Sequence, residues 1–327
     1  MQLKGIHHVT AITSSAEKIY EFFTYVLGMR LVKKTVNQDD INTYHLFFAD
    51  DTGSAGSDMT FFDFKNIQQV KHGNNELHRT SFRVPNDLAL AYWLKRFTKY
   101  NVKHTAVKKM FGHKIIYFED FDEQLYALIS DEHNTGIESG IPWQKGPVPN
   151  EFGITGLGPV FINVNDLVKM KSLLENVFLM RETNQEGNVH LFEMGDGGNG
   201  ASLFIVNDDS KDYSTQGYGG IHHIAFRVET NKKLHAWIDR LNSFGAPNSG
   251  YVDRFYFESL YTRLYPNILF EIATDEPGFI DDEESYEILG EKLALPPRFR
   301  SSQAKIEKIV RPIDTVRSTQ VIKKEYL

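Results

Sequence analysis

The sequence contains no cysteine, and this absence restricts the chemistry open to the chain. Disulfide bonds and thiolate metal ligands are excluded, so any bound metal must be held by histidine, aspartate and glutamate. A protein without disulfides is most typical of the cytoplasm, which is the location we expect. The 327 residues, 41% of them hydrophobic, are enough to form a substantial core and, by length, two domains.

Long apolar runs and an excess of positive charge are also missing. The longest apolar stretches, such as VFINV and NILFEIA, have the length of strands, far below the roughly 20 residues that span a bilayer. The N-terminus lacks a basic segment followed by an apolar one, so we expect no export signal. With 36 Lys and Arg against 43 Asp and Glu, the net charge is −7. We therefore expect neither a membrane nor a nucleic acid as partner.

An internal repeat organises the chain. Four segments share the order of one strand, one amphipathic helix and two or three further strands, and they open at GIHHVTAIT, LHRTSFRV, GLGPVFINV and GIHHIAFRV. Apolar residues spaced by three and four predict the four helices, over residues 15–29, 86–101, 166–180 and 231–245. The sequence therefore predicts an α+β fold built from four βαβββ units.

A Pro- and Gly-rich stretch divides the units into two pairs. We expect an N-terminal domain of two units over residues 1–135 and a linker over residues 136–156. A C-terminal domain of two units follows over residues 157–280. Residues 281–327 form a C-terminal extension beyond the repeats.

Two of the four opening strands carry adjacent histidines, at His7 and His8 and again at His222 and His223. Successive side chains of a strand point to opposite faces, so one member of each pair can face a shared interior. We assign this inward position to His8 and His223. If His8 faces inward, Thr10 shares its face.

A carboxylate completes the candidate site. Glu271 lies in the last strand of the fourth unit between Phe270 and Ile272, where its charge is costly unless a cation compensates it. The second and third units have no ionisable residue at the matching position. Two imidazoles and one carboxylate form the facial triad that suits non-haem Fe(II), which leaves positions open for a substrate and O2. The predicted metal ligands are therefore His8, His223 and Glu271.

The four βαβββ units resemble the glyoxalase, or vicinal-oxygen-chelate, superfamily, in which paired units curl into open barrels around a metal. The motifs HHVT, GIHHIAF and LFEIATDEPGF are similar to those of its ring-cleaving dioxygenases that open hydroquinones. The resemblance implies two open barrels, Fe(II) as the metal, and a small aromatic diol and O2 as substrates, and the sequence leaves open whether Mn(II) can replace Fe(II). It also implies active-site roles for His7, Thr10, His222, Arg254 and Tyr261.

The ligand positions predict how the units pair. The first unit has to pack against the fourth to bring His8 to Glu271, which leaves the second and third units to form a barrel without metal. The remaining histidines have no matched partner in another unit and are expected to be solvated or structural. They are His45, His72, His78, His104, His113, His133, His190 and His235.

Two alternative functions stay open at this point. A metal-dependent lyase or isomerase of the glyoxalase type would need a fourth ligand, and Asp63 could serve if strand register turned it toward the metal. We expect Asp63 to face away. A resistance-type protein that only binds a small aromatic would need no ligands, which the buried Glu271 argues against. Assembly into a homo-oligomer is left open by the sequence.

Overall fold

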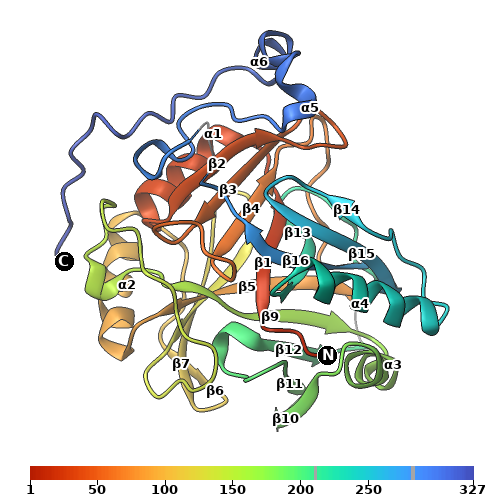
Figure 1. Cartoon of the computed structure of the whole chain (residues 1–327). Helices are drawn as coiled ribbons and strands as arrows, with labels where there is room; N and C mark the ends of the chain where they lie inside the picture. Colours follow the sequence, from red (N-terminus) through yellow and green to blue (C-terminus); the bar gives the residue numbers. More distant parts are fainter. Residues whose placement is uncertain (210–211, 281–283) are drawn as a thin grey trace.

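Two twisted sheets of eight strands each form the frame of the molecule (Figure 1). The computed structural model describes residues 1–209, 212–280 and 284–327. At the centre of the first sheet, β1 (Ile6–Ile12) of the first unit pairs antiparallel with β13 (Gly220–Val228) of the fourth. At the centre of the second, β5 (Glu76–Val84) pairs antiparallel with β9 (Gly156–Val164). The predicted pairing of the first unit with the fourth is confirmed.

Each sheet has the same strand order about its central pair. The first sheet runs β14-β15-β16-β13-β1-β4-β3-β2, and the second runs β10-β11-β12-β9-β5-β8-β7-β6. The remaining strands of the first sheet are β2 (Arg30–Val36), β3 (Tyr44–Ala49), β4 (Asp58–Phe62), β14 (Val252–Asp253), β15 (Phe257–Tyr265) and β16 (Ile268–Pro277). Those of the second are β6 (Lys108–Met110), β7 (His113–Glu119), β8 (Leu125–Ser130), β10 (Arg181–Glu186), β11 (Val189–Glu193) and β12 (Ser202–Asn207).

One helix follows the first strand of every unit, as predicted, and each begins at a side-chain cap. The helices are α1 (Ala16–Glu21), α2 (Asp87–Lys99), α3 (Leu167–Ser172) and α4 (Asn231–Ser243), and α1 and α3 continue into the π-helical turns Phe22–Val26 and Leu173–Val177. The caps are Ser15, Asn86, Asp166 and Thr230, whose side-chain oxygens accept a hydrogen bond from the backbone N–H three residues later. Such caps satisfy backbone donors that a helix leaves free at its start.

The two sheets share one hydrophobic core. Phe23, in the turn after α1, packs its ring 4.9 Å from Phe61 of the first sheet and 5.8 Å from Tyr126 of the second. The core side of each sheet is therefore buried against the other sheet and the helices, and the opposite, concave side is left for a site. In the part of the chain that the structure describes, no helix has the length and apolar character needed to cross a membrane.

The C-terminal extension contacts both halves of the molecule, β2 of the first sheet and α2 beside the second. After α5 (Pro297–Arg300) and α6 (Gln303–Val310), the chain runs along the first sheet and ends near α2 of the second (Figure 1). Lys34 of β2 donates to the carbonyl of Ile313 at 2.9 Å. Arg96 of α2 donates to the carboxylate of Glu325 at 2.7 Å. Each sheet combines units from both halves of the sequence. The domain boundaries expected at residues 135, 156 and 280 remain a prediction.

Arg96 is the strongest of these connections, because its side chain is fully buried and joins three segments. Besides Glu325, it donates to the carbonyls of Val26 and Tyr25, each at 2.7 Å. Arg96→Met should lower the free energy of unfolding by about 3 kcal/mol, because it leaves buried carbonyls without donors. Lys99→Met is the control, since half-exposed Lys99 pairs with the same Glu325 at 3.2 Å and should contribute less than about 1 kcal/mol. Urea denaturation measures both, and equal effects would contradict the assignment.

Candidate metal centre and active-site pocket

Strand register brings the three predicted metal ligands together on the concave face of the first sheet. Ala225 of β13 is the cross-strand partner of His8 on one side and of Glu271 on the other. His223 lies two residues before Ala225 and therefore points to the same face. An alanine between His8 and Glu271 leaves the space above it free.

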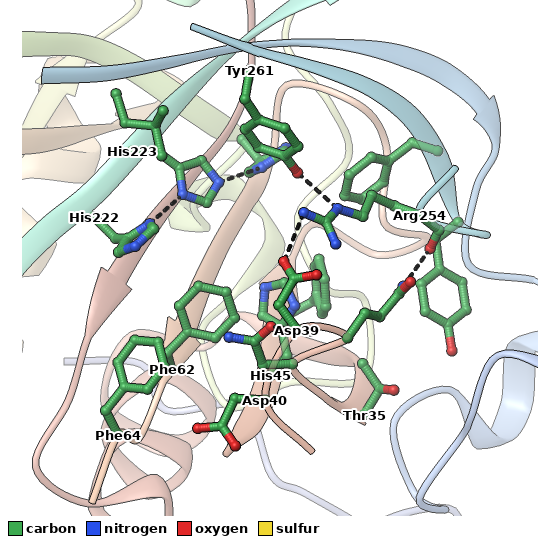
Figure 2. Close-up of a pocket in the computed structure, with 17 residues that line it drawn as sticks. Thr35, Asp39, Asp40, His45, Phe62, Phe64, His222, His223, Arg254 and Tyr261 are labelled. Atoms are coloured by element: carbon green, nitrogen blue, oxygen red, sulfur yellow. Dashed lines mark hydrogen bonds and ion pairs between the residues drawn. The ribbon is translucent and has the colours of Figure 1, made fainter. Parts of the chain in front are cut away.

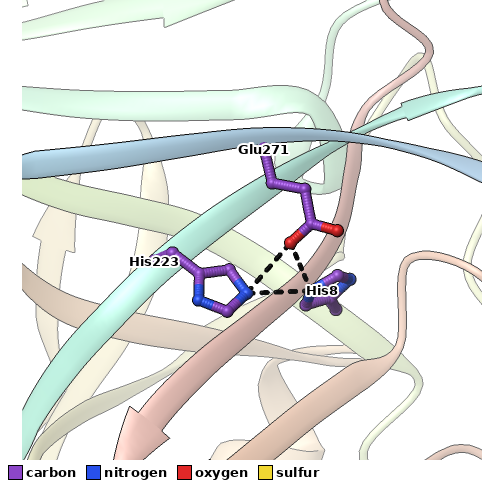
Figure 3. A group of neighbouring side chains, drawn as sticks. All are labelled: His8, His223 and Glu271. Carbon is purple, nitrogen blue, oxygen red and sulfur yellow. Dashed lines mark hydrogen bonds and ion pairs between the residues drawn. The ribbon is translucent and has the colours of Figure 1, made fainter. Parts of the chain in front are cut away.

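The three side chains point their donor atoms at one another (Figure 3). His8 Nε2 and His223 Nε2 are 3.2 Å apart. Glu271 Oε2 lies 3.1 Å from His8 Nε2 and 3.0 Å from His223 Nε2. All three residues are buried, Glu271 completely. Three donor atoms about 2.1 Å from one ion, at right angles to each other, are about 3 Å apart, so these spacings match a facial triad.

The tautomer of His8 is fixed by its neighbour in the sequence. His7 Nε2 lies 2.9 Å from the carbonyl oxygen of Thr274, which can only accept, so this nitrogen carries the proton. Burial lowers the pKa of His7 to about 3, so His7 is neutral and its Nδ1 is an acceptor. That Nδ1 is 2.9 Å from His8 Nδ1, which must donate to it. An imidazole that carries its one proton on Nδ1 has a bare Nε2, and in His8 this atom faces Glu271.

The second histidine pair repeats this arrangement. His222 Nδ1 and His223 Nδ1 are 2.7 Å apart. Burial lowers the pKa of His222 to about 3, so it is also neutral. When His223 donates from Nδ1, as His8 does, its Nε2 is bare as well. In each pair, the first histidine orients the second, which is how outer groups hold metal-binding imidazoles.

Glu271 completes a set of donors that needs a cation. Its Oε1 accepts a hydrogen bond from Ser259, whereas Oε2 has no hydrogen-bond donor among the described residues. Burial alone would raise the pKa of Glu271, but its interactions with His8 and His223 hold it well below its ordinary value. When both imidazoles carry their proton on Nδ1, three unshared electron pairs meet at about 3 Å in a buried site, which is unfavourable unless a cation lies between them. The residues fit a divalent metal.

A cavity of about 450 Å³ adjoins this cluster, since His8 and His223 are among its lining residues. Figure 2 draws the residues that line it. Its wall is largely aromatic, and a smaller polar part comes from the loop between β2 and β3 and from Arg254. The lining residues include Phe47, Phe62, Phe64, Tyr256, Phe257, Tyr261, His45, Asn37, Gln38, Asp39 and Arg254, along with His8, His222 and His223. Its size and composition suit a small aromatic ligand.

Arg254 and Tyr261 form a joined pair at the polar end of the cavity. Arg254 Nε donates to the Tyr261 hydroxyl at 3.0 Å, and its guanidinium also binds the exposed Asp39 at 3.0 Å (Figure 2). Burial, together with the negative charge of Glu271, raises the pKa of Tyr261, so its hydroxyl keeps its proton. Burial lowers the pKa of Arg254, but the interactions with Tyr261 and Asp39 outweigh this and leave it raised. The pair can therefore donate hydrogen bonds to a developing negative charge.

The structure separates the predicted active-site residues into two groups. His222, Arg254 and Tyr261 line the cavity. His7 and Thr10 are not among the described lining residues: His7 supports His8, and Thr10 Oγ1 is hydrogen-bonded to Thr60 Oγ1 at 2.7 Å. Their contact with a substrate remains a prediction.

Sequence reasoning missed several lining residues. His45, for which it predicted a solvated or structural role, is in the cavity wall, as are Gln38, Asp39 and the phenylalanines. The alternation of His45 and Phe47 in TYHLFFAD was a signal that both share one face of β3.

Asp63 faces away from the cluster, as expected. Its Oδ1 accepts the backbone N–H of Tyr44 at 2.7 Å, and its Oδ2 lies 3.4 Å from Arg311 of the C-terminal extension. A carboxylate held in this way cannot serve as a fourth ligand. Asp63 was the fourth ligand considered for a lyase or isomerase of the glyoxalase type, so the structure does not support that alternative.

The second sheet has the same strand order without the ligands. Ala127 pairs with Ser81 as Glu271 pairs with Ala225, and Arg79 lies two residues before Ser81, where the first sheet has His223. Arg79 donates to the carbonyl of Tyr126 at 2.8 Å, and its guanidinium lies 4.6 Å from the ring centre of Tyr117. An arginine among aromatic rings thus takes the position of the metal ligand.

A second cluster with metal-binding residue types joins His72, Glu76 and His78. Each imidazole Nδ1 contacts one oxygen of the Glu76 carboxylate, at 3.1 Å for His72 and 2.7 Å for His78. Gly73 donates to the same carboxylate at 3.2 Å. Hydrogen bonds explain this cluster without an ion, which agrees with the structural role predicted for His72 and His78.

Comparison with known proteins identifies the family. Residues 5–127 and 156–280 match the model of the Glyoxalase/Bleomycin resistance protein/Dioxygenase superfamily, and the chain belongs to this superfamily. Maize glyoxalase I shares the fold with a TM-score of 0.58 and 13% identity, over 83% of this chain and 92% of that one.

Full-length relatives fall within its dioxygenases. MhqA of Bacillus subtilis (strain 168), classed as a ring-cleaving dioxygenase, is 38% identical over 96% of this chain and 100% of its own length. A chlorohydroquinone/hydroquinone 1,2-dioxygenase of Sphingobium indicum is 30% identical over 91% of this chain and 92% of its own. A crystal structure assigned as a B. subtilis dioxygenase superposes with a TM-score of 0.88 at 33% identity, over 96% of this chain and 99% of that one.

The cluster geometry predicts which histidines hold metal. His8→Ala and His223→Ala should each lose most of the bound metal, because two donors alone hold it weakly. Glu271→Gln should keep the shape of the site but weaken metal binding, since it removes the negative charge of the donor set. His78→Ala is the matched control and should keep the metal content of the unchanged protein. Elemental analysis measures the metal content, and full metal content in His8→Ala would rule out the assignment.

Proposed function

We propose that this protein is a ring-cleaving dioxygenase that acts on hydroquinones with Fe(II) held by His8, His223 and Glu271. One observation carries the proposal: the bare donor atoms of the three residues converge in a buried site beside an aromatic cavity of about 450 Å³. The assignment of the Bacillus relative and the activity named for the Sphingobium relative support the same reaction class. Mn(II) is the alternative ion, because the same donor types accept it.

The bound iron would supply the redox chemistry and Lewis acidity through which O2 reacts with an aromatic ring. The chain has to bind the ring, exclude water and move protons. The two hydroxyls of a hydroquinone lie on opposite sides of the ring, so only one of them can be placed at the three-residue cluster. The aromatic rings of Phe47, Phe62 and Phe257 offer flat surfaces for the substrate.

Proton movements fall to the residues around the cluster. His222 is neutral, and when its Nδ1 accepts from His223, its Nε2 carries a proton toward the cavity that it lines. Tyr261 and Arg254 are placed as donors to an oxyanion formed during ring opening, since Tyr261 pairs in register with Glu271 across β15 and β16. We propose His222 as a proton donor to the reacting oxygens, with Tyr261 and Arg254 as the oxyanion-stabilising pair.

Three substitutions test these roles. Tyr261→Phe and His222→Ala should keep iron near one per chain and lower turnover by roughly 10²- to 10⁴-fold, as expected for lost proton transfer. Arg254→Ala should also keep its iron and should raise KM or lower kcat through lost anion stabilisation. Oxygen uptake with hydroquinone, measured on anaerobically reconstituted Fe(II) protein, gives the rates.

The control for Tyr261→Phe is Tyr251→Phe, because Tyr251 is largely exposed and donates to Glu258 outside the cavity. Its turnover should equal that of the unchanged protein. Wild-type turnover in all three cavity variants would refute the assigned roles. The absence of oxygen uptake in the unchanged protein with every hydroquinone tested would refute the proposed function itself.

A further inference from the structure

His45 is the one imidazole in the cavity wall that belongs to neither histidine pair, within the part of the chain that the structure describes. It lies on β3, and its cross-strand partner on β4 is Phe62. Its ring centre lies 4.0 Å from that of Phe47 and 4.4 Å from that of Phe62 (Figure 2). A polar ring is thus set into an apolar wall, which is how binding cavities add specificity to hydrophobic contact.

A row of hydroxyl groups fixes this ring. Nε2 of His45 lies 2.9 Å from Thr60 Oγ1, which is 2.7 Å from Thr10 Oγ1. Thr10 in turn pairs in register with His223 across β1 and β13. The row therefore runs from the strands that carry the metal ligands to His45. With Nε2 held by Thr60, Nδ1 is the remaining polar atom of the ring, and it has no protein partner among the described residues.

The strand order sets the distance that His45 could bridge. The predicted ligands lie on β1, β13 and β16, Tyr261 lies beside them on β15, and His45 lies on the opposite wing of the sheet. From β1 to β3 there are two strand spacings, about 10 Å. The cavity of about 450 Å³ lies between the cluster and His45, and a benzene ring with an oxygen at each end can lie across it.

We propose that His45 binds the hydroxyl of a hydroquinone that points away from the metal, and thereby selects para-diols over monophenols. This inference rests on the proposed function and adds a specificity-determining residue to it. Burial lowers the pKa of His45 well below its ordinary value. The ring is neutral and can accept the proton of a phenolic hydroxyl in a hydrogen bond.

Two substitutions separate the ring nitrogens. Asparagine places a polar atom near the position of Nδ1, and glutamine places one near the position of Nε2. His45→Gln keeps the contact with Thr60 and removes the group that we assign to the substrate. His45→Asn does the reverse. Binding of hydroquinone and of 4-methylphenol, which lacks the second hydroxyl, is measured by anaerobic calorimetry on the Fe(II) protein, and KM and kcat are measured by oxygen uptake.

His45→Gln should weaken hydroquinone binding by about 5- to 10-fold, the usual effect of one hydrogen bond, and leave 4-methylphenol binding unchanged. His45→Asn should stay within about 2-fold of the unchanged protein for both ligands. Unchanged hydroquinone binding in His45→Gln, or an equal loss for both ligands, would overturn the role of His45. Because binding is measured separately from turnover, this result is distinct from a failure of the dioxygenase assignment.

Discussion

The antiparallel register of β1 and β13 is the constraint on which the site depends. It places His8 and then Thr10 opposite Ala225 and His223, so residues 215 positions apart bring their ring nitrogens within 3.2 Å. A shift by one residue would turn every inward side chain of β1 to the opposite face and separate the ligands. The same register lets His7 reach the carbonyl of Thr274 on β16 and so fix the tautomer of His8. Binding chemistry is thus determined by sheet pairing before any ligand is present.

Much of this arrangement was predictable because it repeats. The order of one strand, one helix and further strands occurs four times, so equivalent positions could be compared between the units. The histidine pairs occur in only two of them. Glu271 was conspicuous as a charge inside an apolar strand, and its cost pointed to a compensating cation. The pairing of the first and fourth units followed from these residues alone. Residues whose burial is chemically expensive are therefore informative, because they require a specific partner.

Other parts could not be read from sequence, for identifiable physical reasons. The strand after each helix, β2, β6, β10 or β14, was hard to recognise, and all four lie at sheet edges, where charged residues are common and alternation is weak. The C-terminal extension, described over residues 284–327, is held by single long-range contacts such as that of Arg96 with Glu325. Such contacts leave no periodic pattern in the sequence. The cavity wall combines residues of several strands and a loop. The place of His45 in this wall depends on its contacts with Thr60 and Phe62 of the neighbouring strand, which the sequence does not show.

The nested pairing of the units has a consequence for biogenesis. During synthesis, the second and third units follow each other directly, so the second sheet can form before the fourth unit has been synthesised. Until then, β1 of the first unit lacks its antiparallel partner β13. The ligand-bearing sheet has the longest loop to close, and contacts of high sequence separation form late in folding. A chain interrupted between β9 and β16 would retain both strands of the inner pair, β5 and β9, but lack Glu271. The complete three-residue cluster therefore exists only in chains that extend through β16.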